Sequence, residues 1–166
     1  VLDALDESSS LWWSEKRTSY LVSQMNPRHA ETLRAMMEKP RWSYGTVFRR
    51  IRNKRSMAEL RTDGIAGCLR TPKGGSAKQI LVKAGYGKVY VRHLTPRECA
   101  RLMGAPNFKC DDVPPNQALF GFGDAVCVPV IRWIADYYLN PLAFEMTELL
   151  KTRETHWDGV YSRAVS

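Results

Sequence analysis

The chain has 166 residues, 44% of them hydrophobic, and a formal net charge of +8 at pH 7. This is enough for one domain or two small lobes, and the charge favours a polyanionic partner. The longest apolar run, 125–131, is too short for a membrane span, and the acidic start VLDALDESSS is unlike a secretory leader. We therefore expect a cytoplasmic protein that does not bind membranes.

The four cysteines, Cys68, Cys99, Cys110 and Cys127, include no C-x-x-C pair. Their spacing offers neither a zinc knuckle nor a redox dithiol. We expect reduced thiols that serve mainly in packing, and no metal site.

The first predicted element is a helix that begins at Asn26-Pro27, where Asn can cap and Pro fits the first helical position. Ala30, Leu33 and Met37 follow at helical spacing, and Pro40 ends the pattern.

Residues 41–92 predict a small, loop-rich β region. The short β-prone runs TVFRRI, QILV and KVYVR alternate with glycine-containing turns at 63–64, 74–75 and 85–87. Between positions 41 and 61 there are seven basic residues and one acid, Glu59, and aromatic residues interleave with the charges. Either this is a solvated basic face, or Arg49, Arg50 and Arg52 form a basic ribbon that faces phosphates.

A tightly capped helix is predicted to begin after Thr95. Thr95 and Glu98 have the spacing of a capping box, and Pro96 takes the first helical position. Leu94 and Cys99 are placed to form a hydrophobic staple, and Gly104 to end the helix.

The polar residues 107–116 predict a loop, and a second helix is predicted from Ala125 to Leu139 with Pro129 in its first turn. Asn140-Pro141 is predicted to stop it, and the remainder to form a short helical pattern followed by a polar tail. The apolar stripe of this helix comprises Val126, Val130, Trp133 or Ile134, and Tyr137.

Two strings, in this order and separation, carry a resemblance. RHLTPRECARLMGAP resembles motif IX (R-x-L-T-x-R-E-x-A-R-L-x-G-F-P) of DNA cytosine-5 methyltransferases and departs from it at Ala105. GFGDAVCVPVIRWIA resembles their motif X (G-N-[SA]-V-x-x-P-V), and Gln117 matches a residue often found upstream of it. Less closely, ELRTDGIAGCLRTPKGGSAKQILV resembles the recognition loop of their target recognition domain, with Cys68-Leu69 in place of a Thr-Leu or Thr-Val dipeptide.

The resemblance implies a reaction in which a cysteine thiolate attacks C6 of a flipped cytosine and S-adenosyl-L-methionine supplies a methyl group to C5. In the family the thiolate lies in a Pro-Cys dipeptide, a Glu in E-N-V engages the base, and an F-x-G-x-G loop helps to hold the cofactor. The sequence has no Pro-Cys and no E-N-V. FGFGD at 120–124 resembles the cofactor loop only superficially, because no buried strand precedes it. We therefore expect no catalytic residue here and no activity from this chain alone.

The resemblance also assigns roles to particular residues, each with a plainer alternative. Arg97, Glu98 and Arg101 would organise motif IX by pairing with loops and backbone; alternatively they are exposed helix charges. The recognition loop would contact DNA; alternatively it is a surface hairpin turn. Its contributing residues are Arg70, Thr71, Lys73, Gly74, Gly75, Ser76, Lys78 and Gln79. Gly123, Asp124, Ala125 and Val126 would lie against the cofactor, and Asp124, which replaces the usual Asn, can also cap the following helix.

The predicted fold class is an α/β or α+β fragment, in which a small DNA-recognition lobe is joined to a C-terminal helix. That helix would complete a Rossmann-like methyltransferase domain supplied elsewhere. The expected divisions are a helical lead-in (1–40), a recognition domain with the motif IX helix (41–116), motif X and its helix (117–140) and a tail (141–166).

We expect the DNA-recognition and cofactor-completing part of a cytosine-5 methyltransferase that acts on double-stranded DNA in the prokaryotic cytosol or nucleoid. The catalytic half is either a separate subunit or the front of the same polypeptide, and a chain that begins with Val1 favours the second. The rival hypothesis is a stand-alone basic DNA-binding module without enzymatic activity.

Overall fold

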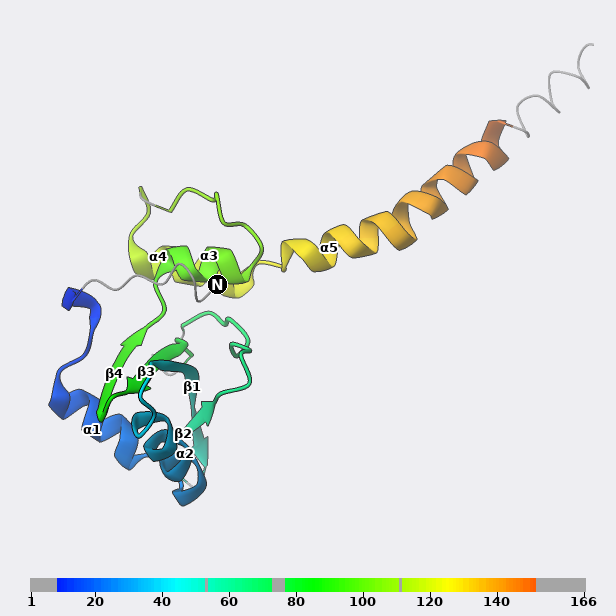
Figure 1. Ribbon diagram of the computed structural model, residues 1–166. Helices are drawn as coiled ribbons and strands as arrows, with labels where there is room; N and C mark the ends of the chain where they lie inside the picture. The colour runs from blue at the N-terminus through cyan, green and yellow to red at the C-terminus, as the bar shows by residue number, and fades with distance from the viewer. Residues whose placement is uncertain (1–8, 53, 73–76, 111, 152–166) are drawn as a thin grey trace, which may run out of the picture. The chain divides into compact units, whose positions relative to one another are not determined.

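A computed structural model describes residues 9–52, 54–72, 77–110 and 112–151 (Figure 1). The chain divides into two compact units, Val1–Ala125 and Val126–Ser166. The first unit combines a small antiparallel sheet with helices, which agrees with the predicted mixture of helices and strands.

In the described part of the first unit, four strands form one antiparallel sheet in the order β2-β1-β3-β4. Their bounds are β1 Ser43–Arg52, β2 Arg55–Arg61, β3 Ile80–Gly85 and β4 Lys88–His93. The three predicted β runs lie in β1, β3 and β4. Strand β2 was not predicted, because RSMAELR is rich in residues with low strand propensity. It forms by pairing with β1 along its whole length, from Arg55 opposite Arg52 to Arg61 opposite Thr46.

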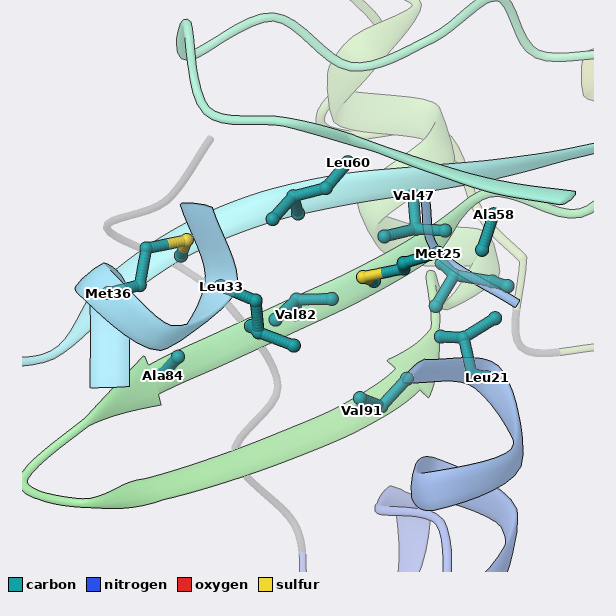
Figure 2. Packing of buried hydrophobic residues seen from close by; sticks show 11 residues of the cluster. Leu21, Met25, Leu33, Met36, Val47, Ala58, Leu60, Val82, Ala84 and Val91 are labelled. Atoms are coloured by element: carbon teal, nitrogen blue, oxygen red, sulfur yellow. The ribbon is translucent and has the colours of Figure 1, made fainter. Parts of the chain in front are cut away.

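Helices α1 (Glu15–Ser23) and α2 (Pro27–Met37) contribute to the core on one face of the sheet. Figure 2 shows side chains from both helices among those of the strands, with Leu21 and Leu33 facing Val82 and Val91. The predicted cap of α2 is present, since Asn26 Oδ1 accepts a hydrogen bond of 3.0 Å from the His29 amide. Helix α1 escaped prediction because its buried residues, Thr18 and Leu21, are too few to define an apolar stripe.

The opposite face of the sheet packs against α3 (Pro96–Leu102) and α4 (Pro115–Asp124). Leu81 points to this face because neighbouring strand residues alternate sides, and it shares a buried cluster with Cys99, Ala100 and Phe122. Helix α4 was not predicted, and its first two residues were placed in the loop 107–116. Two glycines weaken its helical signal, and burial of Phe122 in this cluster stabilises it.

Both ends of α3 form as predicted. The Glu98 amide donates to Thr95 Oγ1 over 3.2 Å, and the Thr95 amide donates to Glu98 Oε2 over 2.8 Å, which completes the capping box. At the other end Gly104 has a φ of 75°, and the Ala105 amide donates to the Ala100 carbonyl over 2.9 Å. This is a Schellman ending, which requires a left-handed residue at the position of Gly104.

The second unit contains α5 (Val128–Ile134) and a π-helical turn, η3 (Ala135–Leu139), after which the helical conformation continues to residue 151. The predicted stop at Asn140-Pro141 is therefore wrong. Pro141 has no amide hydrogen and its ring crowds the preceding turn. The wider π-helical turn directly before it gives the room that a regular α-helix lacks.

Large apolar side chains of this second unit are exposed: Trp133 is 62% exposed, Phe144 68% and Tyr137 72%. By length and composition the segment Pro115–Lys151 could cross a membrane, and 6% of its apolar window is buried. The sequence analysis expected no such segment. A single segment of this kind is weak evidence for a membrane span, because a helix that packs on another protein has the same composition.

Candidate nucleic-acid interface

The most deeply buried polar feature of the first unit is an ion pair between strand β4 and helix α3. Arg92 donates two hydrogen bonds to the Glu98 carboxylate, of 2.8 and 2.7 Å, in a parallel bidentate arrangement. The side chains are 1% and 0% exposed. Because Glu98 also closes the capping box, one carboxylate ties α3 to the sheet and to its own first turn.

Two of the charged residues in the string that resembles motif IX contact other parts of the first unit. Glu98 is buried, which excludes the alternative of an exposed helix charge for this residue. Arg97 donates to the backbone carbonyl of Phe108 over 2.6 Å and to that of Pro106 over 3.3 Å. Arg101 lies half-buried in the last turn of α3.

The sequence analysis missed Arg92 and the aromatic residue that covers it. The Arg92 guanidinium carbon lies 5.0 Å from the centre of the Trp12 ring, and the adjacent Trp13 amide donates to the Val91 carbonyl over 2.8 Å. Arg92 is the first residue of the string that resembles motif IX, and this position was the available signal for it. No local pattern could show that a residue eighty positions earlier packs on it.

Cys99 also lies in this cluster, and the structure supports its predicted packing role. Burial, and after it the negative charge of Glu98, raises the pKa of the Cys99 thiol to about 12. The thiol is therefore protonated at neutral pH and unsuited to act as a nucleophile.

A groove of about 440 Å³ opens where the β1-β2 hairpin meets residues 67–70 and 77–79. Arginine side chains from both segments border it, together with the Phe48 ring and the Gln79 amide. The arginines are Arg49, Arg50, Arg61 and Arg70. Such a concentration of positive charge beside an aromatic ring fits phosphate and base contacts.

The three strand arginines do not form one continuous ribbon. Because side chains alternate along a strand, Arg50 and Arg52 share one face, whereas Arg49 shares the opposite face with its partner Ala58. Both Arg50 and Arg52 form ion pairs with Glu59, at 3.8 and 3.3 Å. These pairs are at least partly exposed and therefore weak, so a phosphate can compete for either arginine.

The recognition loop is described at its two ends, and Lys73, Gly74, Gly75 and Ser76 lie outside the described residues. Arg70 is exposed beside the groove, and Thr71 is half-buried. Gln79 donates through Nε2 to the Cys68 carbonyl over 3.0 Å, so it ties the two ends of the loop together. Its Oε1 atom is buried without a hydrogen-bond partner among the described residues.

Lys78 is not directed to the groove in this structure. Its ammonium group donates to Asn116 Oδ1 at the start of α4, over 2.7 Å. Leu69, the second residue of the dipeptide that departs from the family pattern, packs on the buried cluster of α3 and α4. The loop is therefore anchored by an apolar side chain and by the Cys68 carbonyl.

The four residues of the predicted cofactor turn differ in their surroundings. Asp124, Ala125 and Val126 are exposed. Gly123 instead packs against the recognition loop: a Cβ built on it would clash with the backbone of Arg70 and Thr71 and lie 2.7 Å from the Thr71 Cα. FGFGD at 120–124 lies within helix α4, so it does not form a loop like the F-x-G-x-G cofactor loop of the family.

His93 at the end of β4 lies beside the Trp13 ring and next to Arg17, whose guanidinium is 3.3 Å from His93 Nε2. Burial, and after it the positive charges of Arg17, Lys78 and Arg49, lowers the pKa of His93 from 6.5 to about 4. The imidazole is therefore neutral in the folded protein at neutral pH.

This lowered pKa predicts a loss of stability in acid. Between pH 6.5 and about 4 the unfolded chain binds a proton that folded His93 does not, so the free energy of unfolding falls as the pH falls. We expect a loss of about 2–3 kcal/mol across this range. Urea unfolding at pH 7, 5.5 and 4.5 measures it. An equally steep decline in His93→Gln would contradict the assignment.

Among the described residues no group of three or more His, Cys, Asp or Glu side chains could hold a metal ion.

Comparison with known proteins identifies a family for this chain. Residues 4–139 match the family described as C-5 cytosine-specific DNA methylase. A segment of 45 residues is 51% identical to the Type II methyltransferase M.NlaX of Neisseria lactamica, and it covers 27% of this chain and 14% of that relative. No solved structure matches the chain. Since the family match spans most of the sequence, the chain belongs to the C-5 cytosine-specific DNA methylase family.

Proposed function

We propose that this chain is the C-terminal, DNA-recognising and cofactor-completing part of a DNA cytosine-5 methyltransferase. The observation that carries the proposal is the arginine-lined groove beside the loop that resembles the family's recognition loop. Family membership makes duplex DNA the expected substrate. The thiolate nucleophile and the base-engaging Glu would come from residues outside this sequence, which has neither Pro-Cys nor E-N-V.

In this proposal the groove and the loop have different tasks. Arg50 and Arg61 extend from the hairpin and supply positive charge for phosphates, which fixes the position of the DNA without reading its sequence. Arg70 stands at the start of the loop, where a guanidinium can reach the edge of a guanine. The buried Arg92–Glu98 pair keeps α3, and with it the packing beneath the loop, in a fixed orientation.

S-adenosyl-L-methionine supplies the methyl group in this family. Of the four residues predicted to face it, Asp124 and Ala125 at the end of the first unit are exposed, and so is Val126, the first residue of the second unit. The Asp124 carboxylate can accept hydrogen bonds from hydroxyl or amino groups. Gly123 is already packed against the loop backbone, so we assign the cofactor contacts to the three residues after it.

The second unit fits a role in assembly. Apolar residues line more than one side of its helix, which is typical of a helix that becomes buried. We propose that it packs on a Rossmann-like catalytic domain, either a separate subunit or a preceding part of the same polypeptide. The whole enzyme would act in the prokaryotic cytosol or nucleoid.

The test is the salt dependence of duplex DNA binding by the 166-residue chain. We expect the single variants Arg50→Gln and Arg61→Gln to weaken binding to all sequences and to reduce the slope of log K against log salt by about one unit each. We expect Arg70→Gln to reduce discrimination between sequences. Fluorescence anisotropy over a series of salt concentrations measures both quantities.

Arg28→Gln and Arg34→Gln are matched controls, because each removes one exposed positive charge from α2 on the other face of the sheet. Equal slopes in groove and control variants would show that the groove does not bind phosphates.

A further inference from the structure

We infer that helix α4 fixes both ends of the recognition loop, and that Asn116 and Gly123 are positioning residues for DNA sequence discrimination. The inference about discrimination rests on the proposed function. The clamp itself is a matter of contacts within the first unit and can be tested separately.

The first contact is at the C-terminal end of α4, where two backbones meet with no side chain between them. Gly123 faces the peptide bond between Arg70 and Thr71 so closely that a Cβ would clash with the Thr71 nitrogen and the Arg70 carbonyl carbon. These atoms are backbone and cannot turn aside as a flexible side chain would. Any larger residue at 123 must therefore displace the helix or the start of the loop.

Gly121 shows that this closeness is not a general property of α4. It lies two residues earlier in the same helix, and a Cβ there would meet nothing within 4 Å. Gly in a helix interior is destabilising by roughly 0.5–1 kcal/mol relative to Ala. The close approach supplies a reason for glycine at 123 that does not exist at 121.

The second contact is at the N-terminal end of α4, where Asn116 accepts the hydrogen bond from Lys78 at the far end of the loop. Between the two contacts, Leu119 and Phe122 of α4 border a small cavity that Leu69 and Pro72 also line. One side of α4 therefore underlies both described ends of the loop.

The two contacts lie apart along α4. Asn116 and Gly123 are separated by seven residues of helix, or about 10 Å along the helix axis. The two contacts therefore hold Lys78 and the Arg70–Thr71 peptide at separate points on one helix. Because α4 ends at Asp124, the support of the loop is continuous with the turn that resembles motif X.

The experiment compares Gly123→Ala with Gly121→Ala in the full chain, by hydrogen exchange and by DNA binding. In Gly123→Ala we expect backbone amides in 66–72 and 77–81 to exchange about tenfold or more faster, and discrimination between DNA sequences to fall. In Gly121→Ala we expect both to stay within about twofold of the wild type. Equal behaviour of the two variants would overturn the clamp.

The exposed end of the clamp is tested separately, so that the result does not depend on whether Gly123→Ala folds. We expect Asn116→Leu to speed up exchange in 77–81, whereas Asn116→Asp, which keeps an acceptor for Lys78, should retain protection. Unchanged exchange in Asn116→Leu would contradict this contact. If the wild-type chain bound no DNA, the proposed function would fail, while the exchange comparison would still decide whether α4 holds the loop.

Discussion

Replacement of Glu98 by Ala is expected to lower the free energy of unfolding by about 3–5 kcal/mol, the cost of removing one partner of a buried ion pair. The change leaves the Arg92 guanidinium inside the protein without its bidentate acceptor. It also removes the acceptor of the Thr95 amide and so opens the capping box. Urea unfolding monitored by circular dichroism at pH 7 gives the value.

Two variants separate the cause of this loss. Arg97→Ala, in the same helix, removes hydrogen bonds to exposed loop carbonyls, and we expect a cost of about 1 kcal/mol. The double variant Arg92→Met, Glu98→Leu leaves no buried charge, and we expect it to recover much of the stability lost in Glu98→Ala. A loss below 1 kcal/mol in Glu98→Ala would show that the pair is not buried as described.

The second large effect concerns the apolar helix of the second unit. We expect Trp133→Asp to weaken association with the proposed catalytic part by about 10²- to 10³-fold, since it places a charge in the proposed apolar contact. Trp133 is a better position than Ile134 for this substitution, because Trp133 is exposed beside Tyr137 whereas Ile134 is half-buried. Titration calorimetry measures association.

Transfer of tritium from labelled S-adenosyl-L-methionine to duplex DNA gives the matching activity test. We expect none from this chain alone, transfer from the two parts together, and little from the mixture with Trp133→Asp at limiting concentrations. Arg70→Ala should leave association intact, because Arg70 lies at the arginine-lined groove of the first unit. Methyl transfer by the isolated chain would refute the proposed division of labour. DNA binding without association with a catalytic part would favour the stand-alone module.

Some properties of the candidate DNA-binding site could be predicted from the sequence, and others depend on the tertiary structure. The arginines and the loop were recognisable as candidate DNA contacts, because charge and glycine content are local properties. The different environments of the arginines could not be predicted, because strand pairing decides them. Arg49 lies opposite Ala58, whereas Arg50 and Arg52 form ion pairs with Glu59. Lys78, which was predicted as a DNA contact, donates to Asn116 in this structure, and no local pattern indicated that partner.

By itself the sequence determined what depends on neighbours in the chain. The Asn26 cap, the Thr95–Glu98 capping box and the Gly104 ending all rest on atoms within a few residues, so their spacing was sufficient to predict them. The family resemblance likewise rested on contiguous strings. Helix α4 could not be predicted, because its glycines oppose helix formation and the burial of Phe122 that stabilises it depends on distant residues. Only the tertiary structure decided that Arg92 meets Glu98 in the interior and that Gly123 meets the loop backbone. Both contacts gain their strength from the exclusion of water and from close packing, which no local pattern records.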